Sequence, residues 1–167
     1  MPARETVQGP EVKIVATNRR ARYEYEILDT LEAGIALLGP EVKSLRDGRA
    51  NLTDAYAMVR RGQAYLVGAR ISPYAQAARD NPDPQRERKL LLHKAEIERI
   101  ERKVQEKGLT LVPLEFYFKN GRAKVRLGVA RGKRRYDKRE TIRRREQDRE
   151  MQRATRGRGR GRGRYGE

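Results

Sequence analysis

Residues 111–119 (LVPLEFYFK) and 122–130 (RAKVRLGVA) lie on either side of Asn120-Gly121, and this stretch decides the fold. Asn-Gly is typical of a two-residue hairpin turn, in which both central residues adopt a positive φ. Such a turn sets the register, and every apolar pair that it creates falls on one face of the hairpin. Those pairs are Phe118 with Ala123, Phe116 with Val125, Leu114 with Leu127, and Val112 with Val129. The opposite face pairs Tyr117 with Lys124 and Glu115 with Arg126, and we expect it to face water.

Shorter patterns divide the rest of the chain. A second hairpin is expected where Ala55–Val59 and Ala64–Gly68 flank Arg61-Gly62, and alternation predicts a strand over Tyr23–Leu38 with a bend at Ala33-Gly34. Helices are expected over Pro40–Arg46 and over Lys89–Lys107, where Leu90, Ile97, Ile100 and Val104 form one stripe and Gly108 ends the helix. Several short strands, two or three helices and no βαβ alternation predict a mainly β protein, a small closed β-barrel flanked by helices.

The positive charge is concentrated at the C-terminal end. Of a net charge of +17, residues 131–167 carry +10, from 16 basic and 6 acidic side chains, and residues 1–130 carry +7. From Asp137 to Arg153 only Ile142 and Met151 are large and apolar, so we expect a helix that folds only on binding. Arg156–Arg164 is an Arg-Gly repeat. We therefore divide the chain into a loose arm (1–13), a folded domain (14–130) and a basic tail (131–167).

Composition excludes several classes of protein. No apolar run approaches the roughly 20 residues that span a bilayer, and the N-terminus has no apolar signal region, which indicates an intracellular protein. The absence of cysteine excludes thiolate nucleophiles and Cys-ligated metals, and one histidine, His93, leaves little for a triad or a His-based metal site. We therefore expect no catalytic site and no metal site.

Basic residues alternate with aromatic residues at three places: Arg19–Tyr23, Tyr117–Lys119 and Lys133–Tyr136. Looped RNA favours this combination, because cations neutralise phosphates while exposed bases stack on rings. Arginine outnumbers lysine 30 to 10, and its planar guanidinium suits phosphate and base contacts. The sequence thus predicts an RNA-binding protein.

Several longer strings resemble the SmpB, or SsrA-binding, family of bacteria. They are NRRARYEYEI (Asn18–Ile27), EAGIALLGPEVKSLRDGRANL (Glu32–Leu52), ISPY (Ile71–Tyr74), RKLLLHKAEI (Arg88–Ile97) and EKGLTLVPLEFYFKNGRAKVRLGVARGKRRYDKRE (Glu106–Glu140). The resemblance implies an OB-like closed barrel that binds the tRNA-like domain of transfer-messenger RNA and rescues stalled ribosomes by trans-translation in the cytoplasm. The family protein stands in for an anticodon arm, and its tail enters the decoding centre and the empty mRNA channel. The resemblance further implies that the charged RNA arrives with elongation factor Tu and GTP, so that the protein itself needs no cofactor. The protein is expected to act as a monomer.

The resemblance also implies two groups of site residues. Those matching RNA-binding positions are Asn18, Arg19, Arg20, Arg22, Tyr23, Tyr25, Glu32, Leu91 and His93, to which we add Lys119, Arg122 and Lys124 around the hairpin turn. Those matching the decoding-centre motif are Gly132, Lys133, Arg134, Arg135, Tyr136, Asp137, Lys138 and Arg139. Tyr23 and Tyr136 stand where many members have His, and Ala95 replaces a frequently basic residue.

Two other functions remain open at the level of sequence. A ribosome-associated protein or RNA chaperone would share the charge and the tail, but would bind many RNAs similarly. An RNA-processing enzyme would have to use Glu32 or His93.

Overall fold

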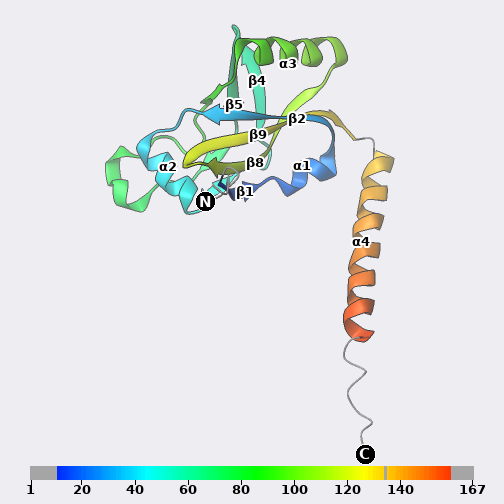
Figure 1. The fold of residues 1–167 in the computed structure, drawn as a ribbon. Helices are drawn as coiled ribbons and strands as arrows, with labels where there is room; N and C mark the ends of the chain where they lie inside the picture. The colour runs from blue at the N-terminus through cyan, green and yellow to red at the C-terminus, as the bar shows by residue number, and fades with distance from the viewer. Residues whose placement is uncertain (1–10, 134, 159–167) are drawn as a thin grey trace, which may run out of the picture. The chain divides into compact units, whose positions relative to one another are not determined.

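A computed structural model describes residues 11–133 and 135–158 (Figure 1). These residues form two compact units, which divide between Gly132 and Lys133. The strands are β1 (Val12–Thr17), β2 (Tyr25–Ile35), β3 (Ala50–Asn51), β4 (Tyr56–Arg60), β5 (Gln63–Val67), β6 (Arg70–Ile71), β7 (Arg88–Leu91), β8 (Thr110–Lys119) and β9 (Arg122–Gly132). The helices are α1 (Arg19–Glu24), α2 (Gly39–Arg46), the 3₁₀ helix η1 (Ala75–Asp80), α3 (Lys94–Lys107) and α4 (Arg135–Arg158).

The strands of the first unit pair into a ring. Its order is β8-β4-β5-β7-β2-β9, and β9 pairs with β8 again, while β1 adds to β8 and β3 pairs with β6 in a small separate sheet. Apolar side chains from β2, β5, β8 and β9 fill the ring, with Leu66, Phe116, Val125 and Leu127 fully buried. The mainly β class with flanking helices is therefore confirmed, and the ring is consistent with an OB-like fold.

The long hairpin is confirmed, but part of its predicted register is wrong. Phe118 faces Ala123 and Phe116 faces Val125 as expected. Leu114 is then an extra residue, so Pro113 faces Leu127 and the pairing slips by one position. Proline has no N–H for the ladder, and Asn18 donates its backbone N–H to the carbonyl of Leu114 at 2.7 Å. The bulge turns Val112 and Leu114 out of the ring into a second apolar cluster beside α1.

Three local predictions need correction. Tyr23 and Glu24 belong to α1, because Asn18 caps a helix there by accepting the N–H of Ala21 at 3.2 Å. Residues 89–91 are in β7, not in a helix, because β7 pairs with β5 and β2 and buries Leu90. Val12 and Lys13 of the expected loose arm lie in β1, opposite Lys119 and Phe118. Residues 1–10 of that arm lie outside the described residues.

A buried ion cluster joins α2 to the start of β7 and the segment before it. Glu41 and Arg88 are almost fully buried, and Arg88 Nε donates to Glu41 Oε2 at 2.7 Å. Arg88 also donates to the carbonyls of Ala69 and Pro84, and Arg86 donates to the same carboxylate from the surface side. Burial alone would raise the pKa of Glu41, but the donors from Arg86, Leu38 and Arg88 outweigh it and lower the pKa.

The second unit contains α4, Arg135–Arg158. A helix is present over 137–153 and continues at both ends, while its folding only on binding stays a prediction. Ile142 and Met151 are both exposed, as expected for a helix without a core face. Of the Arg-Gly repeat, residues 159–164 lie outside the described residues.

Candidate nucleic-acid interface

One outer face of the ring is formed by β2, β9 and β8, and it carries a polar network. Tyr117 donates its hydroxyl to Glu32 Oε2 at 2.5 Å, and Lys119 Nζ lies 3.4 Å from both carboxylate oxygens of Glu32. The ring of Tyr117 lies 5.5 Å below the guanidinium of Arg126, which pairs with Glu115 at 3.2 Å. This is the face that was expected to be wet, yet Tyr117 is only 1% exposed. That expectation is wrong for Tyr117, because the neighbouring charged side chains cover its ring.

The network keeps Glu32 ionised. The hydrogen bond from Tyr117 is the largest influence on its carboxyl and, with the charge of Lys119, lowers the pKa of Glu32 against a smaller effect of burial. Burial and the carboxylate of Glu32 together raise the pKa of Tyr117. At neutral pH the carboxylate of Glu32 is therefore ionised and lies among Lys119, Lys124 and Arg126.

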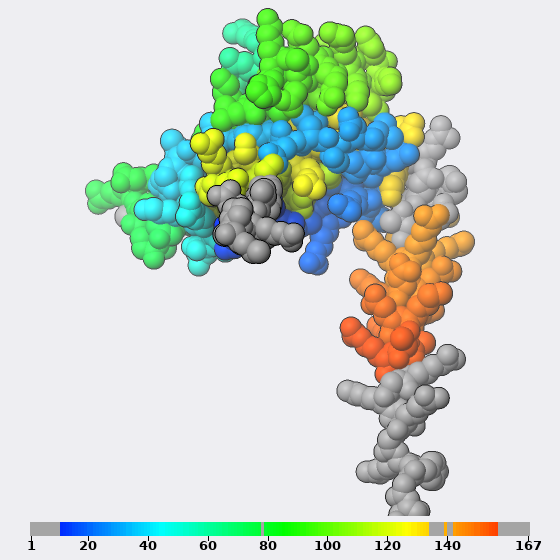
Figure 2. Space-filling view, viewed as in Figure 1, coloured from blue at the N-terminus to red at the C-terminus, as the bar shows by residue number. Residues whose placement is uncertain are grey.

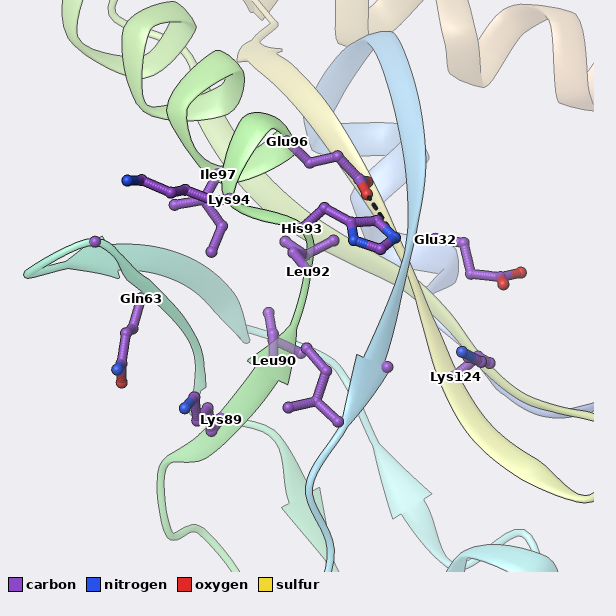
Figure 3. Close-up of a pocket in the computed structure, with 13 residues that line it drawn as sticks. Glu32, Gln63, Lys89, Leu90, Leu92, His93, Lys94, Glu96, Ile97 and Lys124 are labelled. Carbon is purple, nitrogen blue, oxygen red and sulfur yellow. Dashed lines mark ion pairs between the residues drawn. The ribbon is translucent and has the colours of Figure 1, made fainter.

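Beside this network lies an open cavity of about 720 Å³. Its lining residues are Glu32, Gly34, Gly62, Gln63, Lys89, Leu90, Leu91, Leu92, His93, Lys94, Glu96, Ile97 and Lys124. Figure 3 shows Glu32 and Lys124 on one side, Gln63 and Lys89 on the other, and His93 between them. The cavity thus brings together four predicted site residues that lie on β2, β7, the start of α3 and β9: Glu32, Leu91, His93 and Lys124.

Two of these side chains are held out towards solvent by the fold. Leu91 is at the outward position of β7 and is 52% exposed, and His93 is the N-cap residue of α3, with a side chain that is 92% exposed. The Nε2 of His93 lies 4.0 Å from Glu96 Oε1 (Figure 3). Gln63, Lys89 and Lys94 also line the cavity and were not predicted. Only the basic run around Arg88–Lys94 could have indicated the two lysines.

A second group of predicted residues lies on and beside α1. Asn18 is buried, and its Nδ2 donates to the carbonyls of Leu52 and Pro113 at 3.2 and 2.9 Å. Its Oδ1 caps α1, so Asn18 positions this helix, and its role as an RNA contact stays a prediction. Arg19, Arg20 and Arg22 are exposed, while Tyr23 and Tyr25 are half-buried.

The arginines of α1 differ in the ion pairs that they form within the protein. Arg20 pairs with Glu24 at 2.8 Å and lies 3.5 Å from Asp54, whereas Arg19 has no ion-pair partner among the described residues. Tyr25 packs with Ile27 on the apolar cluster formed by Val112 and Leu114. Arg19 is therefore the most available cation of this helix.

The two groups lie at opposite ends of the same strand pair. Tyr25 is opposite Gly132, and Gly34 is opposite Lys124. The seven-residue separation of Tyr25 and Glu32 corresponds to roughly 20 Å along β2. Figure 2 shows the surfaces of β2 and β9 side by side along this face. Arg122 is exposed directly after the turn, opposite Lys119.

The predicted decoding-centre residues begin at the end of β9. Gly132 is the last residue of β9, and Lys133 follows it, half-buried. Residue 134 lies outside the described part of the chain, and α4 contains Arg135 to Arg139 in its first turns, with Arg139 exposed. The backbone of this motif is thus helical from Arg135 onwards.

Within residues 11–133 and 135–158, no group of three His, Cys, Asp or Glu side chains is placed to hold a metal ion. In the same part of the chain, no helix is long and apolar enough to cross a membrane.

Comparisons with known proteins agree on one family. A family model described as SmpB protein matches residues 15–157. The chain is 58% identical over 142 residues to an SsrA-binding protein from Leifsonia xyli subsp. xyli, covering 85% of this chain and 90% of that protein. It is 56% identical over 144 residues to the SsrA-binding protein from Chlorobaculum tepidum, covering 86% and 92%. Among solved structures, a chain of "tmRNA-SmpB: a journey to the center of the bacterial ribosome" is 54% identical, with a TM-score of 0.62, and covers 77% of this chain and 94% of that one.

Proposed function

The chain belongs to the SmpB family, and we propose that it binds transfer-messenger RNA and delivers it to stalled ribosomes for trans-translation. The single observation that carries this proposal is the extent of the family match. Residues 15–157 include both the strand ring and most of α4, so the match covers the two parts that the function needs. Relatives named for SsrA binding, and a solved tmRNA-SmpB structure on the bacterial ribosome, support the same function.

The first unit supplies a surface suited to folded RNA. Base edges in A-form RNA are hidden in a deep, narrow groove, so a protein recognises it by phosphates, 2′-hydroxyls and unpaired bases. Arg19, Arg20 and Arg22 on α1 would contact phosphates, and the cavity beside Glu32 and Leu91 would take an unpaired base. Lys119, Arg122 and Lys124 would add phosphate contacts around the hairpin turn.

The second unit supplies a basic helix. In this proposal Gly132–Arg139 occupies the decoding centre, and the remainder of α4 lies in the mRNA channel when no message fills it. The phosphates of ribosomal RNA would neutralise the arginines of α4, and an occupied channel would exclude the helix. The first unit then stands in for the anticodon arm of the RNA, which arrives with elongation factor Tu and GTP.

The same proposal places a monomeric protein in the cytoplasm and requires no catalysis by the protein. Glu32 and His93 then act as RNA contacts and not as the acid and base of an RNA-processing enzyme.

The first test compares RNAs in competition. The full chain should retain the tRNA-like domain of transfer-messenger RNA against a large excess of bulk tRNA at physiological salt, because shape-specific contacts survive screening better than phosphate contacts alone. Equal retention of both RNAs would indicate a general RNA chaperone and contradict the proposal.

The second test separates the two units. Deletion of residues 131–167 should leave RNA binding largely intact and abolish tag addition on ribosomes stalled at truncated messages. Deletion of residues 159–167 alone is the matched control, because it removes most of the Arg-Gly repeat and leaves α4 in place. Continued rescue without residues 131–167 would refute the role of the tail.

A further inference from the structure

The strand ring is incompletely closed between β4 and β8. Ala57 of β4 faces Leu111 of β8, and within the described residues this is the one position at which the two strands pair. Further along β4, Val59 and Arg60 still pair with β5, but no strand of the described part of the chain lies on their other side. We call this gap the seam of the ring.

The seam leaves one backbone donor and one backbone acceptor available, both on Val59. In an antiparallel pair, successive residues direct their N–H and C=O alternately towards and away from the partner strand. Ala57 directs these groups away from β5 and towards β8, so Val59, two positions further on, also directs its groups away from β5. Within the described residues, no backbone hydrogen bond crosses the seam at Val59. Such a strand edge can pair with an added strand.

A cavity of about 260 Å³, the seam cavity, lies beside this edge. Its apolar lining comes from β4, from α3 and from the segment that enters β8: Met58, Val59, Val104, Leu109 and Leu111. The two leucines are buried, whereas the other three side chains are half-buried, so the cavity opens to the surface. Pockets for small molecules have volumes of roughly 300–1,000 Å³. The smaller seam cavity is therefore better suited to a single apolar side chain from a partner.

The charge at the rim of the seam cavity indicates which partner would fit. Glu101 of α3 lines the cavity and is half-buried, and it forms no ion pair with another of the described residues. A carboxylate repels phosphates and attracts a cation, and Gln105, one turn further along α3, adds a neutral polar group. The seam therefore favours a basic peptide over RNA.

We propose that the seam between β4 and β8 is a docking site for an extended segment of a partner protein, which carries an apolar side chain and, two positions away, a lysine or arginine. The segment adds to β4 as a strand, and its backbone pairs with the N–H and C=O of Val59. Residues two positions apart in a strand lie on the same face. The apolar side chain therefore enters the seam cavity while the cation pairs with Glu101. This interaction is separate from the proposed function, because it includes no contact with RNA.

The test uses a library of random seven-residue peptides displayed on phage and selected on the immobilised full-length chain. We expect enriched peptides to carry an apolar residue and a lysine or arginine two positions apart. One enriched peptide is then synthesised with a fluorescent label, and its dissociation constant is measured by fluorescence anisotropy. Isotope-labelled wild-type protein titrated with the same peptide should show methyl shifts at Val59, Val104 and Leu109, which line the seam cavity.

Two variants separate the backbone contact from the charge contact. Val59→Pro removes an N–H that forms no hydrogen bond across the seam, and proline is tolerated at such strand edges. It should weaken peptide binding about tenfold, because one backbone hydrogen bond is lost. Glu101→Gln should weaken peptide binding about threefold, as expected for a partly exposed ion pair. Glu106→Gln is the matched control, because Glu106 is exposed on the same helix and does not line the seam cavity.

The affinity of each variant for the tRNA-like domain is measured alongside, and it should be unchanged. A selection without enriched peptides would overturn the docking site and show that the seam cavity is a packing gap. Enriched peptides that shift no methyl group of the seam cavity, or that bind Glu101→Gln as tightly as the wild-type protein, would overturn it as well. Loss of RNA affinity in Glu101→Gln but not in Glu106→Gln would show that the seam faces RNA, which would overturn the docking site and leave the proposed function standing.

Discussion

Replacing Glu41 with Gln should unfold the first unit at much lower denaturant concentration. Glu41 is the only carboxylate that forms an ion pair with Arg88 among the described residues, and both side chains are buried. Glutamine keeps the size of the side chain and an acceptor oxygen, but it leaves the guanidinium of Arg88 without its carboxylate. Arg86, which shares the same carboxylate, can turn to solvent, whereas Arg88 cannot.

The size of the stability loss in Glu41→Gln follows from the burial of the ion pair. Removing one partner of a buried ion pair costs about 3–5 kcal/mol, because the remaining charge stays uncompensated in the interior. With a urea m-value of about 1.5 kcal/mol per M, that cost lowers the unfolding midpoint by about 2–3 M. The loss would be a large share of the roughly 5–15 kcal/mol by which a domain is stable.

The pH dependence gives the effect a second signature. The pKa of Glu41 is lowered in the folded state from its ordinary value of 4.5. Its contribution is therefore fully present above pH 4.5 and is lost as the pH falls through the lower, folded-state pKa. The difference in stability between the wild-type protein and Glu41→Gln should accordingly shrink below pH 4.5.

Unfolding is best followed by tyrosine fluorescence and near-UV circular dichroism, since the chain has eight tyrosines and no tryptophan. The far-UV signal would include α4, which belongs to the other unit. Glu87→Gln is the matched control, because the Arg60–Glu87 pair at 3.1 Å is exposed on both sides and its removal should leave the midpoint unchanged. A midpoint for Glu41→Gln within about 0.5 M of the control would refute the reasoning.

Three further predictions concern α1 and the tail. Asn18→Ala should cost about 2–3 kcal/mol in urea unfolding, since it removes the helix cap and two buried hydrogen bonds, those to the carbonyls of Leu52 and Pro113; an unchanged midpoint would contradict its structural role. Arg19→Ala combined with Arg22→Ala should weaken RNA binding and flatten the salt dependence by about one unit for each phosphate that is no longer bound, and an unchanged slope would mean that neither arginine binds phosphate. Tyr136→Ala should impair tag addition with RNA affinity nearly intact, and a large loss of affinity would contradict the separation of roles between ring and tail.

Local signals predicted the hairpins well, because their information lies in adjacent residues. Asn120 has a φ of 51° and Gly121 one of 77°, as the Asn-Gly turn requires. The bulge at Leu114 depends instead on a residue distant in the sequence, Asn18, which donates hydrogen bonds to the carbonyls of Pro113 and Leu114. Pro113 and Gly128 were its visible signals, since proline has no N–H for the ladder and a side chain at position 128 would meet Ile27 and Leu114 at 3.3 Å.

The other wrong predictions also concern structure that depends on residues far apart in the sequence. Residues 89–91 have good helix formers and extend the apolar stripe of α3, so periodicity favoured a helix. Pairing with β5 and β2 overrides that preference, and the burial of Arg88 depends on Glu41, 47 positions away. The cavity is likewise assembled from β2, β7, α3 and β9, so the sequence predicted four of its lining residues, Glu32, Leu91, His93 and Lys124, but not that they lie together.

The helix α4 links the charge of the chain to its proposed use. Ile142 and Met151 are nine positions apart, and at about 100° per residue they point to opposite sides, so they cannot form one apolar face. The helix therefore lacks the amphipathic stripe that stabilises helices in globular proteins. Contact with a polyanion can stabilise the helix in place of such a stripe, because phosphates neutralise the repulsion among arginines on every side at once. A groove in a protein would contact only one side of the helix and would neutralise only the arginines on that side. A channel lined by RNA is therefore the partner that fits a helix charged all round.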